Sequence, residues 1–165
     1  MNAHNKKNNQ RGFTLIEILV VIGIIALLAT IVIVAINPAR QFAQARNTQR
    51  TSNVNTILNG IGQRIADNKG VFSGAVGLQN CPALTVGTVY NITSTAGATN
   101  IDISCLTPTY IPAFPFDPSA AGAHWTSAAD YDSVYTVTVD ANGRYTVSAP
   151  TVETVLGNPV ISVTR

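Results

Sequence analysis

The chain has 165 residues, of which 46% are hydrophobic and only 11% are charged, and its formal net charge is +2. The length allows one domain in addition to a membrane segment. Residues 1–69 hold eight basic and two acidic side chains, whereas residues 70–165 hold two basic and six acidic ones. The pI of about 8.7 therefore describes a basic N-terminal part and a mildly acidic remainder, which excludes a generally basic nucleic-acid-binding surface.

A polar leader precedes a long apolar stretch. Residues 1–12 are rich in Asn and basic side chains, so they cannot form a core and are interpreted as a leader peptide. Residues 13–36 contain a single charge, Glu17. The uncharged residues 18–36 would span about 28 Å as a helix, close to the thickness of a bilayer core of roughly 30 Å. The stretch therefore predicts a membrane-spanning helix, and its costly carboxylate indicates a function.

An ordinary secretory signal fits this N-terminus poorly. The apolar stretch is too long for the hydrophobic region of such a signal, it contains Glu17, and no clear A-x-A cleavage site follows it. Charge does not orient the segment either, because three basic residues lie on each side of it, and the positive-inside rule gives a tie. These residues are Lys6, Lys7 and Arg11 on one side and Arg40, Arg46 and Arg50 on the other. We interpret the second group as a solvated or interface face.

The dipeptide Asn37-Pro38 interrupts the helical pattern. Proline lacks a backbone donor and clashes with the carbonyl group four residues earlier, here that of Val34. Two outcomes are open. The helix either kinks near Pro38, or it stops at Ile36 and a new helix begins with Asn37 as N-cap and Pro38 at its first position.

Residues 39–69 predict a second, amphipathic helix within a segment that we assign to 37–69. Its apolar side chains recur at steps of three and four residues, which places them on one face. They are Val54, Ile57, Leu58, Ile61 and Ile65. Gly70 is a typical helix C-cap signal. We expect the apolar face to pack against the protein's own C-terminal region.

Residues 70–165 predict a small, mostly antiparallel β-sheet, which we call the head. Strand-like patterns occur at 86–92, 101–105, 134–139, 144–148 and 160–164. Residues 140–143 predict a hairpin turn, with Gly143 where a positive φ is needed. Residues 107–122 contain four prolines and predict an irregular loop. The predicted fold class is therefore α+β, with a long N-terminal helix, kinked or broken near Pro38, packed on a β-sheet head.

Cys81 and Cys105 are the two cysteines of the chain. Behind an export-type N-terminus, two cysteines favour one disulfide. Two unrelated buried thiols are the alternative. Metal binding is disfavoured, because neither cysteine belongs to a CxxC pair and His124 is the only histidine outside the leader. We also find no catalytic constellation, so an enzyme is not expected.

The segment Gly12-Phe13-Thr14-Leu15-Ile16-Glu17, placed between a basic leader and an apolar stretch, resembles the class III signal of type IV pilins and pseudopilins. The resemblance covers roughly residues 6–36. It implies that prepilin peptidase cleaves after Gly12 on the cytoplasmic side and N-methylates Phe13. It also implies that Glu17, about 6 Å along the helix from Phe13, pairs with the Phe13 amine of a neighbouring subunit during assembly.

The resemblance further implies a cellular context. The leader would lie in the cytoplasm, the helix in the inner membrane and the head outside, before assembly into a cell-surface filament. The implied partners are identical or related pilin subunits, prepilin peptidase, a cytoplasmic assembly ATPase, a membrane platform protein and membrane lipid. The alternatives are a type II secretion pseudopilin and a minor pilin that binds DNA or a surface; the acidic head argues against nucleic acid. An enzyme tethered by a signal anchor is a more distant alternative.

Two details go beyond the shared motif. Many family members have a helix-breaking proline about four residues earlier, where this chain has Val34. A helical stretch loosened on assembly would then be shifted toward residues 23–38. Related pseudopilins bind calcium through C-terminal loops, so Asp130 and Asp132, with Asp117 upstream, are candidate calcium ligands; no other cofactor is expected.

Overall fold

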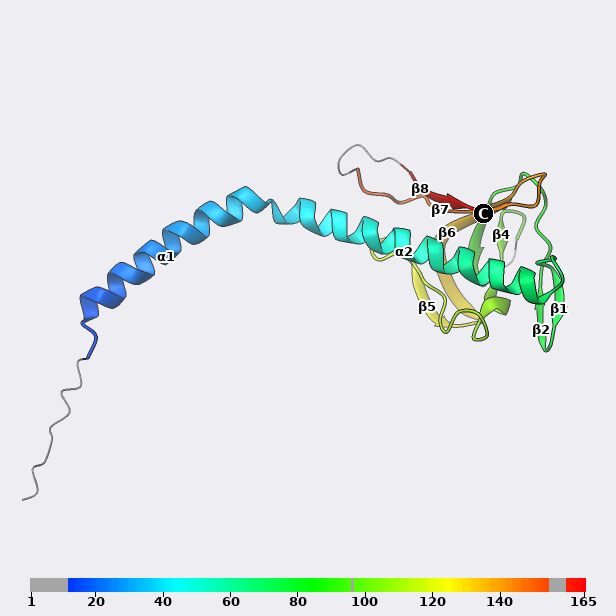
Figure 1. Ribbon diagram of the computed structural model, residues 1–165, viewed down its shortest axis with the longest axis horizontal. Coiled ribbons are helices and arrows are strands. Elements are labelled where there is room, and N and C mark those ends of the chain that lie inside the picture. The colour runs from blue at the N-terminus through cyan, green and yellow to red at the C-terminus, as the bar shows by residue number, and fades with distance from the viewer. Residues whose placement is uncertain (1–11, 96, 155–159) are drawn as a thin grey trace, which may run out of the picture. The chain divides into compact units, whose positions relative to one another are not determined.

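The computed structural model describes residues 12–95, 97–154 and 160–165 (Figure 1). The chain divides into two compact units, the first ending at Gln41 and the second covering Phe42–Arg165. The predicted α+β class is confirmed. An apolar N-terminal helix and a second helix are followed by a β-sheet that is antiparallel except for one strand pair.

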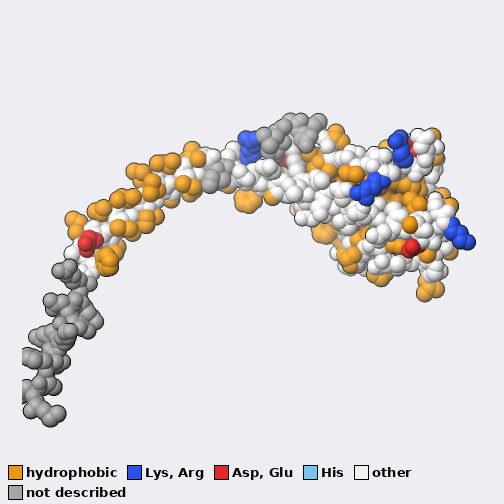
Figure 2. All heavy atoms as spheres, viewed as in Figure 1, with side chains coloured by type: hydrophobic (Ala, Val, Ile, Leu, Met, Phe, Trp, Pro, Cys, Tyr) orange, Lys and Arg blue, Asp and Glu red, His pale blue; other side chains and the backbone are white. Residues whose placement is uncertain are grey.

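Helix α1 (Leu15–Ile36) is the apolar helix of the first unit. Thr14 is its N-cap, and its side chains from Leu15 to Ala35 are all exposed. Figure 2 shows hydrophobic side chains along the visible face of this helix. By length and composition, the segment Leu15–Ala35 can cross a membrane, and it is the one such helix within the described ranges.

Asn37 separates α1 from α2 (Pro38–Asp67). Its φ of 47° lies in the left-handed region, which ends α1. Its side-chain Oδ1 then accepts a bond from the Arg40 backbone N at 3.3 Å, so the same residue also caps the start of α2. Of the two outcomes open at Pro38, the structure has the second: the helix stops and restarts. At the other end, α2 stops at Asp67, and Lys69 (φ 55°) and Gly70 (φ 92°) both have left-handed backbones. Gly70 N donates to Ile65 O at 2.8 Å, so Gly70 closes the helix end one residue beyond the left-handed Lys69.

The main sheet of the second unit has six strands. They are β3 (Tyr90–Thr93), β4 (Asn100–Ile101), β5 (His124–Ser127), β6 (Asp130–Val139), β7 (Tyr145–Ala149) and β8 (Ile161–Thr164). The order is β4-β3-β6-β7-β8, β5 pairs with the start of β6, and only β3 and β4 run parallel. A separate hairpin is formed by β1 (Gly74–Val76) and β2 (Gln79–Cys81), and a short 3₁₀ helix, η1, covers Ser104–Leu106.

Some of the predicted strands and loops agree with the structure and others do not. The hairpin at residues 140–143 is confirmed, because it joins β6 to β7 and Gly143 has a φ of 78°. The irregular loop at 107–122 is also confirmed. The predictions for 86–92 and 101–105 were wrong in extent, since β3 starts at Tyr90 and a 3₁₀ turn follows β4. β1, β2 and β5 were not predicted, because they are short and lack a clear alternation of apolar and polar residues.

The apolar face of α2 forms the centre of the core, as expected. Val54, Ile57, Leu58 and Ile61 are at most 2% exposed, and Ile65 packs at the edge. They belong to a single cluster that also includes Tyr131, Tyr135 and Val137 of β6, Val147 of β7, Leu106 at the end of η1 and Ile111 in the loop after η1. Burying each such aliphatic side chain stabilises the fold by about 1.5–3 kcal/mol before entropy is counted. This packing attaches α2 to the sheet.

Candidate functional site

The segment before α1 is exposed and non-helical. Gly12 has no atom within 4 Å of the position where a Cβ would lie, and Phe13 is 84% exposed. Thr14 has an extended backbone, with φ −81° and ψ 152°. The predicted cleavage bond between Gly12 and Phe13 therefore lies in an accessible stretch of chain. The leader residues 1–11 lie outside the described residues.

Glu17 has a partner within its own chain. Its Oε2 accepts bonds from the Thr14 backbone N at 2.7 Å and from Thr14 Oγ1 at 2.8 Å, and the Glu17 N in turn donates to Thr14 Oγ1 at 3.3 Å. This reciprocal arrangement is a capping box, and it places the carboxylate at the positive end of the helix dipole. Sequence reasoning missed this contact, although the Thr-x-x-Glu spacing was its signal. Both bonds to Glu17 use the same oxygen, Oε2.

Arg50 occupies a different environment from the solvated or interface face assigned to it, and that assignment was wrong. The side chain is completely buried. Its Nε donates to Asp117 Oδ2 at 2.7 Å, and its Nη2 donates to Asp117 Oδ1 at 3.1 Å and to Ser119 at 2.7 Å. Its Nη1 donates to Asn47 at 2.8 Å and to Glu153 at 3.4 Å. All five guanidinium N–H donors therefore have acceptors, which is what a buried arginine needs.

Asp117 is the counter-charge of Arg50 and is 2% exposed. Burial alone would raise the pKa of this carboxyl. Hydrogen bonds from Arg50 and Thr151, and from the backbone N–H groups of Ser119 and Ala120, outweigh burial and lower the pKa to about 2. Asp117 is therefore ionised at neutral pH, and it holds the loop at 117–120 against α2.

A second contact holds the segment after β7 on α2. Arg46 forms a two-pronged ion pair with Glu153, which lowers the pKa of Glu153. The side chain of Asn47 donates to Glu153 O at 2.8 Å and accepts from Glu153 N at 3.2 Å. Of Arg40, Arg46 and Arg50, Arg40 alone has no such side-chain contact among the described residues, and it is exposed. The Arg46 and Arg50 side chains are thus used to hold the fold together.

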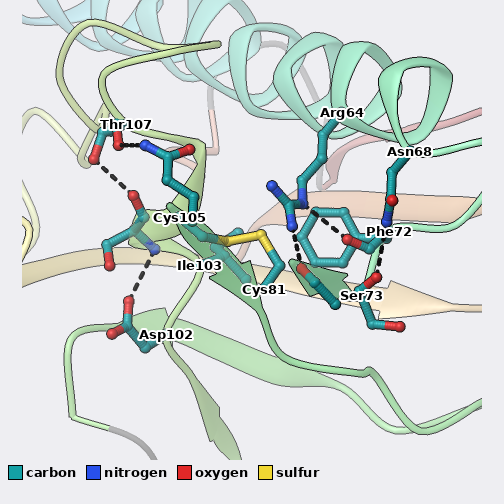
Figure 3. Close-up of a disulfide and its surroundings, with 12 residues drawn as sticks. Arg64, Asn68, Phe72, Ser73, Cys81, Asp102, Ile103, Cys105 and Thr107 are labelled. Carbon is teal, nitrogen blue, oxygen red and sulfur yellow. Dashed lines mark hydrogen bonds between the residues drawn. A yellow bond between two sulfur atoms is a disulfide. The ribbon is translucent and has the colours of Figure 1, made fainter. Parts of the chain in front are cut away.

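The two cysteines are joined, and they connect β2 to η1 (Figure 3). Cys81 is buried at the end of β2, and Cys105 packs against the core from η1. Arg64 lies nearby and is completely buried, with its Nε donating to Phe72 O at 2.9 Å and its Nη2 donating to Gly74 O. These contacts connect the β1–β2 hairpin both to the end of α2 and to η1.

The candidate calcium ligands have other partners. Asp130 Oδ1 lies 3.1 Å from His124 Nε2, and Asp132 Oδ1 accepts from Val134 N at 2.9 Å. Asp117 accepts hydrogen bonds from Arg50. Within the described ranges, no group of three or more His, Cys, Asp or Glu residues could hold a metal ion.

Comparison with known families identifies the N-terminal segment. The prokaryotic N-terminal methylation motif matches residues 7–33. This is the prepilin-type motif of type IV pilins and pseudopilins, and the chain carries it. The motif supports a pilin-like or pseudopilin subunit, a structural class of protein, and the apolar α1 is consistent with a membrane anchor. No curated protein and no solved structure gives a significant match to the chain.

Proposed function

We propose that this chain is the structural subunit of a type IV pilus-like filament. In this proposal residues 1–12 are the leader, 13–36 the membrane and assembly helix, 37–69 the amphipathic helix and 70–165 the extracytoplasmic head. Prepilin peptidase removes the leader after Gly12 and methylates Phe13. The subunit waits in the inner membrane with its N-terminus in the cytoplasm, and an assembly ATPase and a membrane platform protein then transfer it into the filament.

The observation that carries the proposal is the methylation motif at the start of an apolar helix whose side chains are exposed. Exposed apolar surface on this scale requires an apolar environment outside the chain. A bilayer supplies that environment before assembly, and a bundle of neighbouring α1 helices supplies it afterwards. The exposed segment around Gly12 and Phe13 is compatible with access by a peptidase.

Glu17 has a defined role in the proposal. Cleavage after Gly12 creates a charged amino group on Phe13. The Glu17 carboxylate of one subunit then neutralises the Phe13 amino group of its neighbour. The capping box with Thr14 holds the carboxylate at the helix start until then. A carboxylate without a partner inside a membrane costs about 2.5–3.5 kcal/mol, so pairing with an ammonium group favours the assembled state.

Two related functions use the same helix. A type II secretion pseudopilin would form a shorter filament with the same contacts, and a minor pilin would carry a ligand-binding head. The charges argue against DNA as that ligand, because the head, residues 70–165, has two basic and six acidic side chains. In α2, Arg46 is ion-paired and Arg50 and Arg64 are buried. We therefore prefer the filament subunit.

The test uses cells that produce the full chain, with sheared surface filaments measured by electron microscopy and N-terminal sequencing. We expect a mature N-terminus at methylated Phe13. We expect Glu17→Gln to be cleaved normally but not assembled, because the amide keeps the shape and loses the charge. A mature N-terminus at any other residue would contradict the proposal.

Thr14→Ala is the matched control for Glu17. It removes the Thr14 hydroxyl, which donates to Glu17 Oε2 and accepts from Glu17 N, and leaves the carboxylate and its bond from the backbone N of residue 14 in place. If Glu17 pairs with a neighbouring subunit, Thr14→Ala assembles while Glu17→Gln does not. If Glu17 acts only as part of the cap, Glu17→Gln assembles at least as well as Thr14→Ala, because a glutamine can also accept from the backbone N of Thr14. That result would exclude the pairing role.

A further inference from the structure

A polar pocket of the head opens between the exit of the β1–β2 hairpin and the edge strand β4. It measures about 460 Å³, which falls within the range of about 300–1,000 Å³ for small-molecule sites. Its wall comes from three segments of the chain. Asn80 and Pro82 lie on the side of the hairpin, and Tyr90 belongs to β3. Asn100 and Asp102 lie in β4 and directly after it.

The disulfide connects two sides of this pocket (Figure 3). Cys81 lies between Asn80 and Pro82 in the sequence. Its partner Cys105 lies three residues after Asp102. The disulfide therefore limits how far these two segments can move apart, whether or not a ligand is present. A pocket that is formed in advance lowers the entropic cost of binding.

Asp102 is the charged residue of the pocket, and its carboxylate is held in one orientation. Its Oδ1 accepts bonds from the Tyr131 hydroxyl at 2.9 Å and from Ser104 N at 2.8 Å (Figure 3). Its second oxygen, Oδ2, has no hydrogen-bond partner among the described residues and is open to solvent. Asp102 therefore presents a free acceptor in a fixed position.

Two amide side chains add donors and acceptors to the pocket. Asn80 is exposed, and its side chain has no hydrogen bond with any described residue. Asn100 Oδ1 accepts from Asn91 Nδ2 at 3.1 Å, which orients the Asn100 amide. Gly97 also lines the pocket, and a Cβ on it would lie 3.8 Å from Asn100 Nδ2. Amide groups both donate and accept, as the hydroxyl groups of a ligand do.

The remaining wall is apolar, and it includes two rings. Tyr90 is half-buried and packs against the core of the head, whereas Pro82 is exposed. The face of an aromatic ring carries partial negative charge and attracts the positive edge of other groups. The C–H groups on one face of a sugar ring are such a partner. The pocket thus combines an aromatic residue with free hydrogen-bonding groups.

The charges of the pocket narrow the class of ligand. Among the described residues that line it there is no Lys, Arg or His, so a phosphate, a sulfate or another anion would have no counter-charge. A single carboxylate without a second acidic neighbour in the lining also gives little support for a metal ion. A neutral molecule that is rich in hydroxyl groups and has an apolar C–H face matches all of these groups.

We propose that this pocket binds a neutral saccharide. Asp102 Oδ2 and the amides of Asn80 and Asn100 bind its hydroxyl groups, and Tyr90 contacts its apolar face. The inference goes beyond the proposed function, because it gives the head a ligand and does not depend on assembly of a filament.

The experiment uses the full chain in a zwitterionic detergent, so that no sugar headgroup competes for the pocket. The probes are neutral oligosaccharides of glucose, galactose, mannose and N-acetylglucosamine. A sulfated oligosaccharide and methylammonium are the anionic and cationic control probes. Binding is measured by isothermal titration calorimetry. We expect at least one neutral probe to bind at one site per chain and neither control probe to bind.

Two variants locate the site. Asn80→Ala removes an exposed side chain without a partner in the described part of the fold, so we expect the fold to be unchanged and the affinity to fall roughly five- to tenfold, as for one neutral hydrogen bond. Asp102→Asn keeps an oxygen for Tyr131 and Ser104 but loses the charge, and we expect a fall of roughly ten- to hundredfold. Gln63→Ala changes an exposed amide on α2, outside the pocket, and should bind like the unaltered chain.

Four outcomes would overturn the proposal. They are no binding of any neutral probe, unchanged affinity of Asn80→Ala, binding of the sulfated probe as tightly as the neutral ones, and binding of methylammonium that depends on Asp102 alone. Near-UV circular dichroism shows whether Asp102→Asn is folded, and if it is not, Asn80→Ala decides. Cleavage after Gly12 and the dependence of filaments on Glu17 are measured separately, so failure of this inference and failure of the proposed function are distinguishable.

Discussion

The two helices of this protein reverse the usual relation between composition and burial. α1 has one charged residue among its 22, and its described side chains are exposed. α2 is rich in Gln, Asn, Thr and Arg, yet nine of its 30 residues are buried, two arginines among them. The difference shows which of the two helices finds its packing and hydrogen-bonding partners within its own chain. α2 finds its partners in the sheet and loops of its own unit, whereas α1 requires a bilayer or other subunits.

The largest effect is expected at the buried charge of α2. Arg50→Ala leaves Asp117 buried without its counter-ion, so we expect a loss of about 3–5 kcal/mol in the free energy of unfolding. The measurement is chemical unfolding of the full chain in detergent, followed by near-UV circular dichroism. Arg40→Ala is the control and should change stability by less than about 0.5 kcal/mol. Similar small losses for both would mean that Arg50 is not buried as described.

The apolar residues of the two helices should respond differently to truncation. Ile57→Ala creates a cavity in the core, so we expect a loss of about 2–5 kcal/mol. Ile25→Ala, in the exposed α1, should leave unfolding of the second unit unchanged in the same assay. Equal losses would show that α1 contributes to the same core and would remove the distinction between the helices.

The ion pair of α2 also makes stability depend on pH. The pKa of Asp117 is lowered from 3.8 to about 2 in the folded protein. The contribution of Asp117 to the free energy of unfolding is therefore fully present above pH 3.8 and is lost as the pH falls through 2. This contribution amounts to about 2 kcal/mol. The free energy of unfolding, measured between pH 6 and pH 2, should show this decline. In Asp117→Asn the free energy of unfolding should fall less steeply over the same range. A variant with an unchanged slope would exclude Asp117 as the titrating group.

The smallest effects separate two faces of α2. A Cβ on Gly60 would lie 2.8 Å from Ile111 Cδ1, so Gly60→Ala should cost about 1–3 kcal/mol through overpacking. At Gly62 the space is open, so Gly62→Ala should stabilise the helix by about 0.5–1 kcal/mol. We expect the midpoint temperature of thermal unfolding to fall for Gly60→Ala and to rise for Gly62→Ala. A change in the same direction for both would contradict the assigned faces.

The sequence alone determined the features that depend on local pattern. The span of α1, the buried face of α2 and the β6–β7 hairpin follow from periodicity and from the restrictions on Gly and Pro. The cleavage and methylation motif was recognised by its resemblance to a family signal, and at Pro38 the sequence left a kink and a restart open. The Thr14–Glu17 capping box is equally local and was available from spacing. Each of these signals lies within a few residues of the structure that it specifies.

Tertiary structure decided the features that depend on distant partners. Arg50 resembles any surface arginine until Asp117, 67 residues away, and Ser119 provide acceptors for it. The short strands β1 and β2 have little pattern of their own and are held by Arg64 and by the disulfide. Burial of a charge, and the holding of a short hairpin, depend on which groups the completed fold brings together, and spacing along the chain does not contain that information.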